Sequence, residues 1–498
     1  MSVQQDVSAA RVDFEAFRSM MAWLMVGLVP LGFHYFMATE NLFDDKQLLF
    51  LSLVAGAVLL WIFRLVPDFV PGLALVIIVV LLNLVPQDVA FNGFGSEVFF
   101  LVFGVFILSM LLSESTWFDW VTAVMNRRNA SFRSGIWTIL GAGALLTLMV
   151  PSPLGRASMV QPMVKRLWRP EGRQRNSALA AAHIHGTTIL STIVLTGNPL
   201  NFILIGLLAE QSQSRFAWVG WITATWFAGI FLCVSMVLLF AFWGRNAARA
   251  DGVAEAASPH SEVEPLPPIG LGDWATLGLY GLLFAAILGR DIHQIPLQWI
   301  VMLLAVSVFF FSGISQKVLR SKFDWQTLVF IATVVAWGPM LDQLELSTKL
   351  ADSLSFLVSV FELESIKIGP LFFGLVDQFS INLNGFYLGL FTMIAVVLVV
   401  RLVVPGAPAF ILLASTLMPM ADSIGMSPWV VGFIIVTMSE AFIWPYQHGV
   451  YSQTVTELET EGVAYSSGVL LVTNIFFLLM RCVAILLCVS WWMRIDLI

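Results

Sequence analysis

Long apolar stretches without charge recur along nearly the whole chain, and they constrain its fold more than any other feature. Each is about 17–25 residues long, which is the length that a helix needs to cross a bilayer. The strands of a membrane barrel would alternate apolar and polar residues, whereas these stretches are continuous. Only 11% of the 498 residues are charged, against about 25% in a soluble domain. The sequence therefore predicts an all-α polytopic membrane protein.

The composition also excludes several classes of function. The net charge of −7 argues against a nucleic-acid partner. Three cysteines have no metal-ligand or redox spacing, so no metal site is expected. The chain carries no HExxH, GxSxG or Walker motif, so a membrane-embedded enzyme would lack a catalytic constellation. We therefore expect no enzyme and no cofactor; the expected partners are membrane lipid and a small substrate.

Two basic segments indicate the topology, because Lys and Arg accumulate on the cytoplasmic side of a membrane. They read "NRRNASFR" (126–133) and "VKRLWRPEGRQR" (164–175). The apolar run at 134–165 lies between them, so both of its ends are predicted to be inside. It holds "VPSPLG" at its centre, and Pro and Gly interrupt helices. We expect a re-entrant hairpin there, which is allowed only where the backbone is buried in protein or lines a wet cavity.

An internal repeat relates the two halves of the chain. The segment 96–125 is matched by 324–354, and "VPSPLG" is followed in the second half by "VPGAPA" (404–409). The interrupted run around "TGNPLN" (196–201) has its counterpart in "IWPYQHGVY" (443–451). Counting crossings, the second hairpin opens from the outside, so the repeat is inverted. Paired Gly/Pro interruptions in an apolar context are the best sequence pointer to the substrate site of a transporter.

These observations predict the organisation of the chain. We expect a multi-pass protein of the plasma membrane, a bacterial inner membrane, with its N-terminus in the cytoplasm and its C-terminus outside. In the first half we expect a cytoplasmic N-terminal segment (1–18), scaffold helices (19–95) and the first repeat (96–243), which holds an inward-opening hairpin (134–165) and a broken helix (177–208). A cytoplasmic linker (244–270) and further scaffold helices (271–323) follow. The second repeat (324–498) holds an outward-opening hairpin (about 380–421), a broken helix (428–456) and a last helix (465–494).

The order of these elements resembles the divalent anion/sodium symporter family, within the ion transporter superfamily. The first break keeps the Gly, Pro and Asn of the family's Gly-Thr-Pro-Pro-Asn pattern as Gly197, Pro199 and Asn201. The second break has His448 where the family has Thr and Tyr451 where it has Asn. The resemblance implies about 11 transmembrane helices, two opposed hairpins, scaffold and transport subdomains, an elevator movement, sodium symport and a homodimer.

The hairpin tips depart most from that family. Its members carry Ser-Asn-Thr ten residues before a Pro of the second arm. The same count from Pro162 gives Ser152, Pro153 and Leu154, and from Pro419 it gives Ala409, Phe410 and Ile411. We therefore expect a divergent member that lacks both Ser-Asn-Thr signatures.

The chemistry of interrupted helices suggests the binding residues. The amides at the start of a half-helix carry positive partial charge and suit an anion, and Arg156 adds a cation that could hold a carboxylate or sulfonate bidentately. Arg401, a few residues before the second tip, is a further candidate for contact with the substrate, with snorkelling as its alternative. The expected substrate-binding residues are Ser152, Pro153, Leu154, Gly155, Arg156, Ala407, Pro408, Ala409, Phe410 and His448.

The carbonyls at the end of a half-helix suit a cation such as Na⁺ instead, and the coupling ion is expected to be Na⁺ or H⁺. The candidate ion-binding residues are Pro151, Thr196, Gly197, Asn198, Asn201 and Pro445. Ionisable groups in apolar runs are functional hypotheses by default, and His titrates near neutral pH. Asp377, Glu440 and His448 are therefore candidates for coupling to H⁺.

The leading interpretation is a secondary active transporter of a small anion, a carboxylate or sulfonate with room for apolar parts. It would work by alternating access and be coupled to Na⁺ or H⁺. A second interpretation is a cation/proton antiporter or exporter of the same superfamily. A third, from another class, is a membrane-embedded lipid-handling protein.

Overall fold

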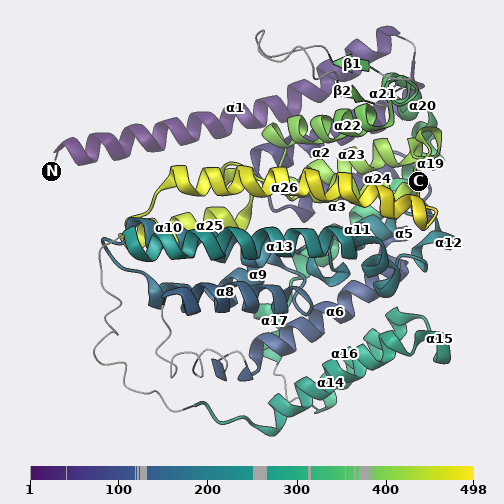
Figure 1. The fold of residues 1–498 in the computed structure, drawn as a ribbon. Helices are drawn as coiled ribbons and strands as arrows, with labels where there is room; N and C mark the ends of the chain where they lie inside the picture. Colours follow the sequence, from purple (N-terminus) through teal and green to yellow (C-terminus); the bar gives the residue numbers. More distant parts are fainter. Residues whose placement is uncertain are drawn as a thin grey trace.

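The computed structural model describes residues 2–40, 42–117, 119–120, 123, 132–250, 266–311, 316–353, 355–363, 366–368, 381–383 and 385–498. Long helices run side by side through the described part of the chain (Figure 1). An antiparallel pair joins β1 (Ile366–Ile368) to β2 (Ile381–Leu383), with Ile366 opposite Leu383. Asp377, the central part of the 244–270 linker and most of the basic segment at 126–133 lie outside the described residues.

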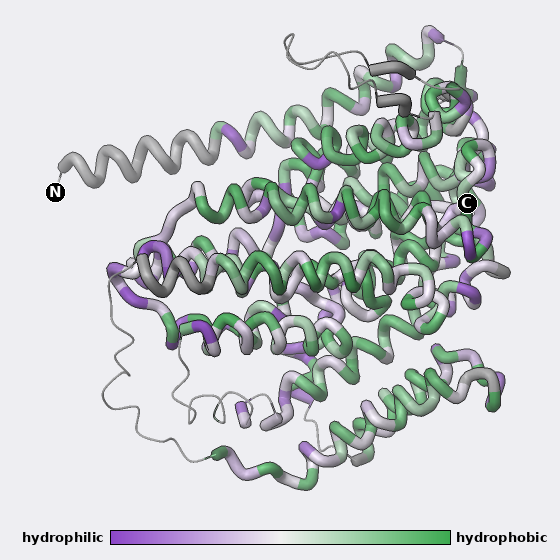
Figure 2. The backbone as a smooth tube through the Cα atoms, in the orientation of Figure 1, coloured by the Kyte–Doolittle hydropathy of each residue, from purple (hydrophilic) through white to green (hydrophobic). Residues whose placement is uncertain are grey.

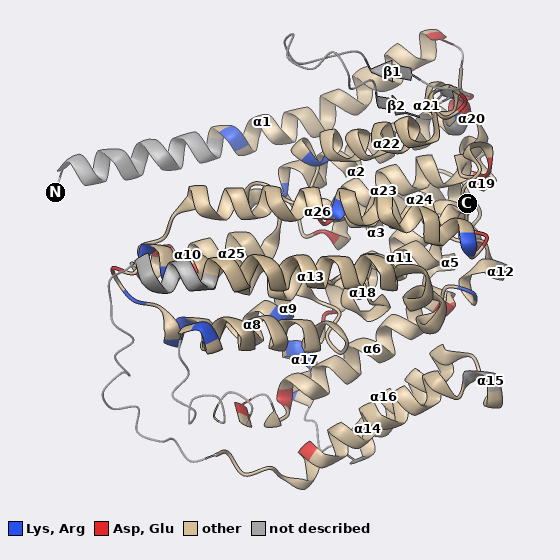
Figure 3. Ribbon diagram, viewed as in Figure 1, with Lys and Arg blue, Asp and Glu red and all other residues tan. Residues whose placement is uncertain are grey.

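Seven helices of the described part are long and apolar enough to cross a membrane. Hydrophobic residues predominate along the coloured parts of these helices (Figure 2), and long stretches carry no charge (Figure 3). The all-α polytopic fold is thereby confirmed. The spans lie in α1 (Ser2–Glu40), α2 (Asp45–Phe63), α6 (Glu97–Glu114), α13 (Trp218–Ala250), α14 (Leu271–Leu288), α22 (Gly385–Val403) and α26 (Ser467–Arg494).

Shorter helices fill the space between these spans. Two of them, α3 (Phe69–Leu81) and α16 (Leu297–Phe311), are apolar. The other short elements outside the hairpins and breaks are α4 (Gln87–Ala90), α5 (Asn92–Gly95), α12 (Glu210–Gln213), α15 (Arg290–His293), α17 (Gln316–Lys322), α18 (Trp325–Val335), α19 (Trp337–Gln343), α20 (Leu346–Ser353), α21 (Ser355–Phe361), η2 (Met418–Met420) and η3 (Asp422–Ile424).

In the first repeat, a helical hairpin packs against an interrupted helix. The hairpin consists of α8 (Phe132–Thr147) and α9 (Pro153–Leu167), and the Ser152 hydroxyl caps α9 by accepting from the Gly155 amide at 3.1 Å. The chain turns here because Pro151 and Pro153 cannot continue a helix. The interrupted helix consists of α10 (Arg173–Thr188), the 3₁₀ turn η1 (Leu195–Gly197) and α11 (Pro199–Gly206).

The second repeat is built in the same order. Its hairpin consists of α22 and α23 (Gly406–Leu417), joined at Val404 and Pro405. Its interrupted helix consists of α24 (Pro428–Ser439), the 3₁₀ turn η4 (Pro445–Gln447) and α25 (Gly449–Thr460). The α24 helix packs against α11, α23 and α26, so the two interrupted helices lie in contact.

Contacts at one end of the bundle tie the two repeats together. The Asn176 amide in α10 donates to the Ala464 carbonyl at 2.9 Å, and the Ser466 N–H donates to the Ser177 hydroxyl at 2.8 Å. Lys165, near the end of α9, forms ion pairs with Glu457 and Glu461 of α25 and its following turn. Hydrogen bonds to these two carboxylates raise the pKa of the Lys165 amine above its ordinary value. The first hairpin is therefore attached to the second interrupted helix.

Candidate functional site

Both interruptions have the same backbone geometry. In the first, the Gly197 N–H donates to the Val194 carbonyl to close the 3₁₀ turn; in the second, the Gln447 N–H donates to Trp444. The next residue is extended in both, with φ −153° and ψ 137° at Asn198 and φ −142° and ψ 128° at His448. Each of these side chains then accepts from the amide two residues on, as helix N-caps do.

The Arg156 guanidinium lies at the first break and is fully buried. Because α9 starts at the hairpin tip, its first turn carries Arg156 back toward the interrupted helix. Nη1 donates to the Val150 carbonyl at 2.5 Å and to the Gly197 carbonyl at 2.7 Å. Nε and Nη2 donate to the Thr187 carbonyl at 3.1 and 2.8 Å, and Nη2 also donates to the Ser191 hydroxyl at 2.6 Å. This one side chain therefore joins the hairpin tip to the break.

The Asn201 side chain completes the first break from α11. Its amide nitrogen donates to the carbonyls of Ser191 at 2.9 Å and Val194 at 2.8 Å. The Thr196 hydroxyl donates to the Leu148 carbonyl in the hairpin at 2.9 Å. Asn201 is fully buried, and its Oδ1 has no hydrogen-bond partner among the described residues. That oxygen is an acceptor left open at the break.

Arg401 occupies the matching place in the second half. Its Nη1 donates to the Val404 carbonyl at 2.9 Å, and its Nη2 donates to the Gln447 and Ala441 carbonyls at 3.0 and 3.3 Å. The Gln447 side chain supports this arrangement, since Nε2 donates to the Arg401 carbonyl and Oε1 accepts from the Ile443 N–H. Arg401 is only 2% exposed.

A third buried arginine lies between the two interrupted helices. Arg481 of α26 donates from Nη1 to the Thr437 carbonyl at 3.2 Å and from Nη2 to the Thr188 carbonyl at 3.4 Å. These carbonyls belong to the last turns of α24 and α10, where the helix dipole places a partial negative charge. Beside them, the Glu440 carboxylate lies 3.5 Å from His448 Nε2. Glu440 interacts electrostatically with Arg156, Arg401 and Arg481.

Arg156, Arg401, Arg481, Glu440 and His448 form a largely buried cluster of ionisable side chains at the two breaks, which we call the centre. The two hairpin tips contact different parts of it. Leu154 in the first tip lies against Gly449: a Cβ atom added to Gly449 would be 3.6 Å from Leu154 Cδ1. The first tip therefore contacts the start of α25. Gly406 in the second tip lies against the Ser439 carbonyl at the end of α24. The remaining residues expected at the tips lie at the N-cap and start of α9 and in the first five residues of α23, namely Ser152, Pro153, Gly155, Ala407, Pro408, Ala409 and Phe410.

The sequence-predicted residues are thus close to the centre, but several have protein partners. The Pro151 carbonyl accepts from Arg156 at 3.4 Å, and the Asn198 side chain caps α11. Pro445 begins the turn η4. Sequence reasoning assigned no role to Arg481, Gln447 or Asn474. The signal for Arg481 was its charge inside an apolar run; the other two are ordinary polar residues that only the fold brings to the breaks.

The two histidines of the His-Ile-His stretch in α10, His183 and His185, have different partners. His185 makes a hydrogen bond to the Asn474 side chain at 3.1 Å and stacks on Phe442 with ring centroids 5.7 Å apart. His183 instead contacts the Thr454 hydroxyl at 3.1 Å and the Ala157 carbonyl at 2.9 Å. Both side chains bind the interrupted helices to each other or to the hairpin, and neither faces the other.

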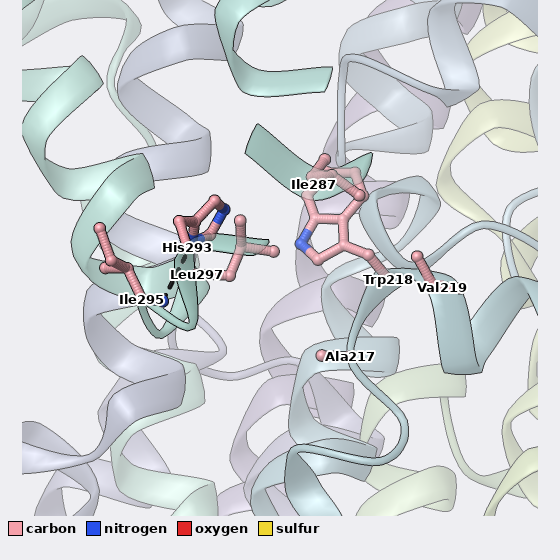
Figure 4. A pocket seen from close by; sticks show the side chains of 7 residues that line it. All are labelled: Ala217, Trp218, Val219, Ile287, His293, Ile295 and Leu297. Atoms are coloured by element: carbon pink, nitrogen blue, oxygen red, sulfur yellow. Dashed lines mark hydrogen bonds between the residues drawn. The ribbon is translucent and has the colours of Figure 1, made fainter. Parts of the chain in front are cut away.

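Two of the cavities in the described part of the chain lie beside the second break and near the end of α14. A cleft of about 860 Å³ lies beside the second break, and Arg18, Arg64, Arg401, Tyr446 and Gln447 are among the residues that line it. This volume is within the range of small-molecule sites. A second pocket, near His293 and Trp218, holds only about 10 Å³ and is lined mostly by apolar side chains (Figure 4). It is too small for more than one water molecule.

Comparison with known proteins gives one family match. Residues 58–438 match the citrate transporter family, which covers both hairpins and the first interrupted helix. No curated protein matches the chain. The expected membership of the wider superfamily agrees with this match, whereas the assignment to the divalent anion/sodium symporters stays a prediction. The matched region spans most of the 498 residues, and the chain belongs to the citrate transporter family of the ion transporter superfamily.

Proposed function

We propose that the protein is a secondary active transporter that moves a small carboxylate-type anion across the membrane by alternating access. The family supports a carboxylate-type substrate, since its description names citrate. The interrupted helices and hairpin tips supply the irregular backbone on which such transporters build their sites. In this proposal the substrate binds at the centre formed by the first tip, the start of α25 and the Glu440–His448 pair.

The charge of the centre is the observation that carries this proposal. Arg156, Arg401 and Arg481 are each at most 2% exposed, and among the described residues Glu440 is the one buried carboxylate that interacts with all three. Three guanidinium charges less one carboxylate charge leave a net charge of +2 when His448 is neutral. Guanidinium groups stay protonated in proteins, and uncompensated buried charge is costly. An anion with two negative charges would neutralise the centre.

The Glu440–His448 pair is the proposed coupling element. The two groups lie 3.5 Å apart, at the end of α24 and at the cap of α25. Protonation of either one changes the charge seen by an anion at the centre, which links proton binding to substrate binding. Coupling to Na⁺ is the alternative, with the open Asn201 oxygen as its nearest ligand. The cytoplasmic N-terminus, the homodimer and the elevator movement are parts of the same proposal.

Uptake into proteoliposomes tests the proposal. The panel consists of radiolabelled citrate, succinate, sulfate, taurine and phosphate, with a Na⁺ gradient and a pH gradient imposed separately. We expect carboxylates to accumulate under the pH gradient and expect Glu440→Gln to abolish that accumulation while leaving exchange of carboxylate across the membrane. Failure of every carboxylate to accumulate under either gradient would contradict the proposal. Arg215→Ala, at an exposed turn where Arg215 donates to the Ile495 carbonyl and lies over the Phe216 ring, is the matched control.

A further inference from the structure

Many of the carbonyls at the helix breaks accept hydrogen bonds from side chains of the chain itself. An interrupted helix leaves carbonyls without their usual amide partners, and in a membrane they need another donor or a cation. At the first break the donors come from Arg156, Arg481, Asn201, Trp221 and Thr225. The accepting carbonyls are those of Thr187, Thr188, Ser191, Thr192, Ile193, Val194, Leu195 and Gly197.

Arg156 and Arg401 bind equivalent carbonyls in the two halves. Each donates to the valine of the Val-Pro pair at its own hairpin tip, at 2.5 Å for Val150 and 2.9 Å for Val404. Each also donates to the last residue of the 3₁₀ turn at the break, at 2.7 Å for Gly197 and 3.0 Å for Gln447. One guanidinium thus bridges tip and break in each repeat, at the place where carbonyls of both would surround a cation.

The two arginines reach these carbonyls from different arms of their hairpins. Arg156 lies in α9, the arm after the tip, whereas Arg401 lies in α22, the arm before it. The shared contacts are therefore not a simple result of the internal repeat, because the repeat does not place these two residues at equivalent positions. What the halves have in common is a positive charge between the same two carbonyls.

We propose that the guanidinium groups of Arg156 and Arg401 are resident cations, which hold the two tip-to-break junctions in place of coupling sodium ions. A guanidinium presents five N–H donors in a fixed plane and never loses its charge in a protein. It therefore satisfies several carbonyls at once and cannot dissociate. The proposal deepens the function proposed above by excluding Na⁺ as the coupling ion, so coupling falls to the proton-binding Glu440–His448 pair.

The first test uses the unmodified protein in detergent and needs no transport. Thermal unfolding is measured in NaCl, KCl and choline chloride at equal ionic strength, because an ion that binds the folded state raises the unfolding temperature. We expect the three salts to agree within about 1 °C. A saturable rise that is specific to Na⁺ would overturn the proposal. Because the readout is binding, it stands whether or not carboxylate transport is later observed.

The second test removes each of the two arginine side chains by substitution with glycine, which leaves a cavity where the guanidinium was. In Arg156→Gly and Arg401→Gly, we expect lower unfolding temperatures that about 20 mM guanidinium partly restores, a concentration well below its denaturing range. Equimolar Na⁺ should restore less. Arg156→Lys should stay destabilised, since one ammonium cannot span the same carbonyls. Arg215→Gly, at an exposed turn, should show no response to guanidinium.

Restoration by Na⁺ equal to or greater than that by guanidinium would overturn the proposal, as would no restoration by guanidinium in either variant. If both glycine variants fail to fold, the salt comparison on the unmodified protein decides alone.

Discussion

Asn198 and His448 occupy equivalent structural positions in the two interrupted helices. Both are extended residues that follow a 3₁₀ turn, and both cap the next half-helix through a side-chain acceptor, at 2.9 Å from the Leu200 amide and 3.2 Å from the Val450 amide. Of the two side chains, only the imidazole of His448 is ionisable. The two breaks are therefore alike in shape and different in chemistry.

This difference predicts separate effects for two substitutions at the second cap. His448→Ala should lower the free energy of unfolding by about 0.5–2 kcal/mol through loss of the cap and should abolish pH-driven uptake. His448→Asn should restore most of the stability, because Asn198 shows that an Asn fits this geometry, but it should not restore the pH dependence. Unfolding temperature and uptake from pH 5.5 to 8 are the measurements. Normal pH-driven uptake by His448→Asn would remove His448 from the coupling mechanism.

Replacing Arg481 should destabilise both interrupted helices together. Arg481→Met keeps much of the side-chain volume but leaves the Thr188 and Thr437 carbonyls without that donor. It also removes a positive charge that interacts with Glu440. We expect a loss of about 2–4 kcal/mol, measured by thermal unfolding. Arg494→Met, at the end of the same helix, is the control and should change stability by less than about 0.5 kcal/mol.

Cross-links at two places should have opposite effects on transport. Ser158 in α9 and Gln453 in α25 are joined by a side-chain hydrogen bond of 3.3 Å, so a link between Ser158→Cys and Gln453→Cys should leave uptake intact. Arg64, after α2, donates to the Tyr446 carbonyl at 2.9 Å. A link between Arg64→Cys and Tyr446→Cys should stop uptake, because it joins the expected scaffold to the moving part.

Short bifunctional thiol reagents, with reduction as the control, check both links by uptake before and after treatment. Unimpaired uptake with the second link fully formed would contradict an elevator movement of the interrupted helices against α2.

The Lys165 contact should give a small stability that depends on pH and salt. The pKa of Lys165 is raised above its ordinary value of 10.5 by hydrogen bonds to Glu457 and Glu461. Its stabilisation is therefore fully present below pH 10.5 and is lost as the pH rises through the folded-state pKa. Because the pair is exposed, Lys165→Met should cost less than about 1 kcal/mol at pH 8. The cost should shrink in high salt, as thermal unfolding of both proteins will measure.

The sequence predicted the fold well because its signals are local. Apolar length marks the spans, and Gly and Pro mark the tips at Pro151 and Pro405 and the breaks at Gly197 and Pro445. The hydrogen-bond partners of the side chains at the centre depend instead largely on residues far away in the sequence. Arg156 was expected to face a substrate, yet its donors contact backbone carbonyls from three segments. Only the packed structure shows which carbonyls reach it.

The same reason explains the residues that sequence reasoning missed. Gln447 and Asn474 carry no charge and follow no motif, and their importance comes from neighbours far along the chain. The Asn474 side chain meets His185, 289 residues away. Such pairs arise from tertiary packing, so neither periodicity nor spacing could indicate them.

The hydrogen bond from Asn176 to Ala464 sets a condition on how the protein is made. The two residues are 288 positions apart, and ribosomes add about 5–20 residues each second. The start of α10 is thus complete about 15–60 s before its partner exists. During that interval the Asn176 side chain, which ends up fully buried, has its local partner Arg169, whose N–H donates to Oδ1 at 3.0 Å and whose carbonyl accepts from Nδ2 at 2.6 Å, but its bond to the second repeat cannot yet form. Assembly of the first repeat is finished only when the second has been synthesised.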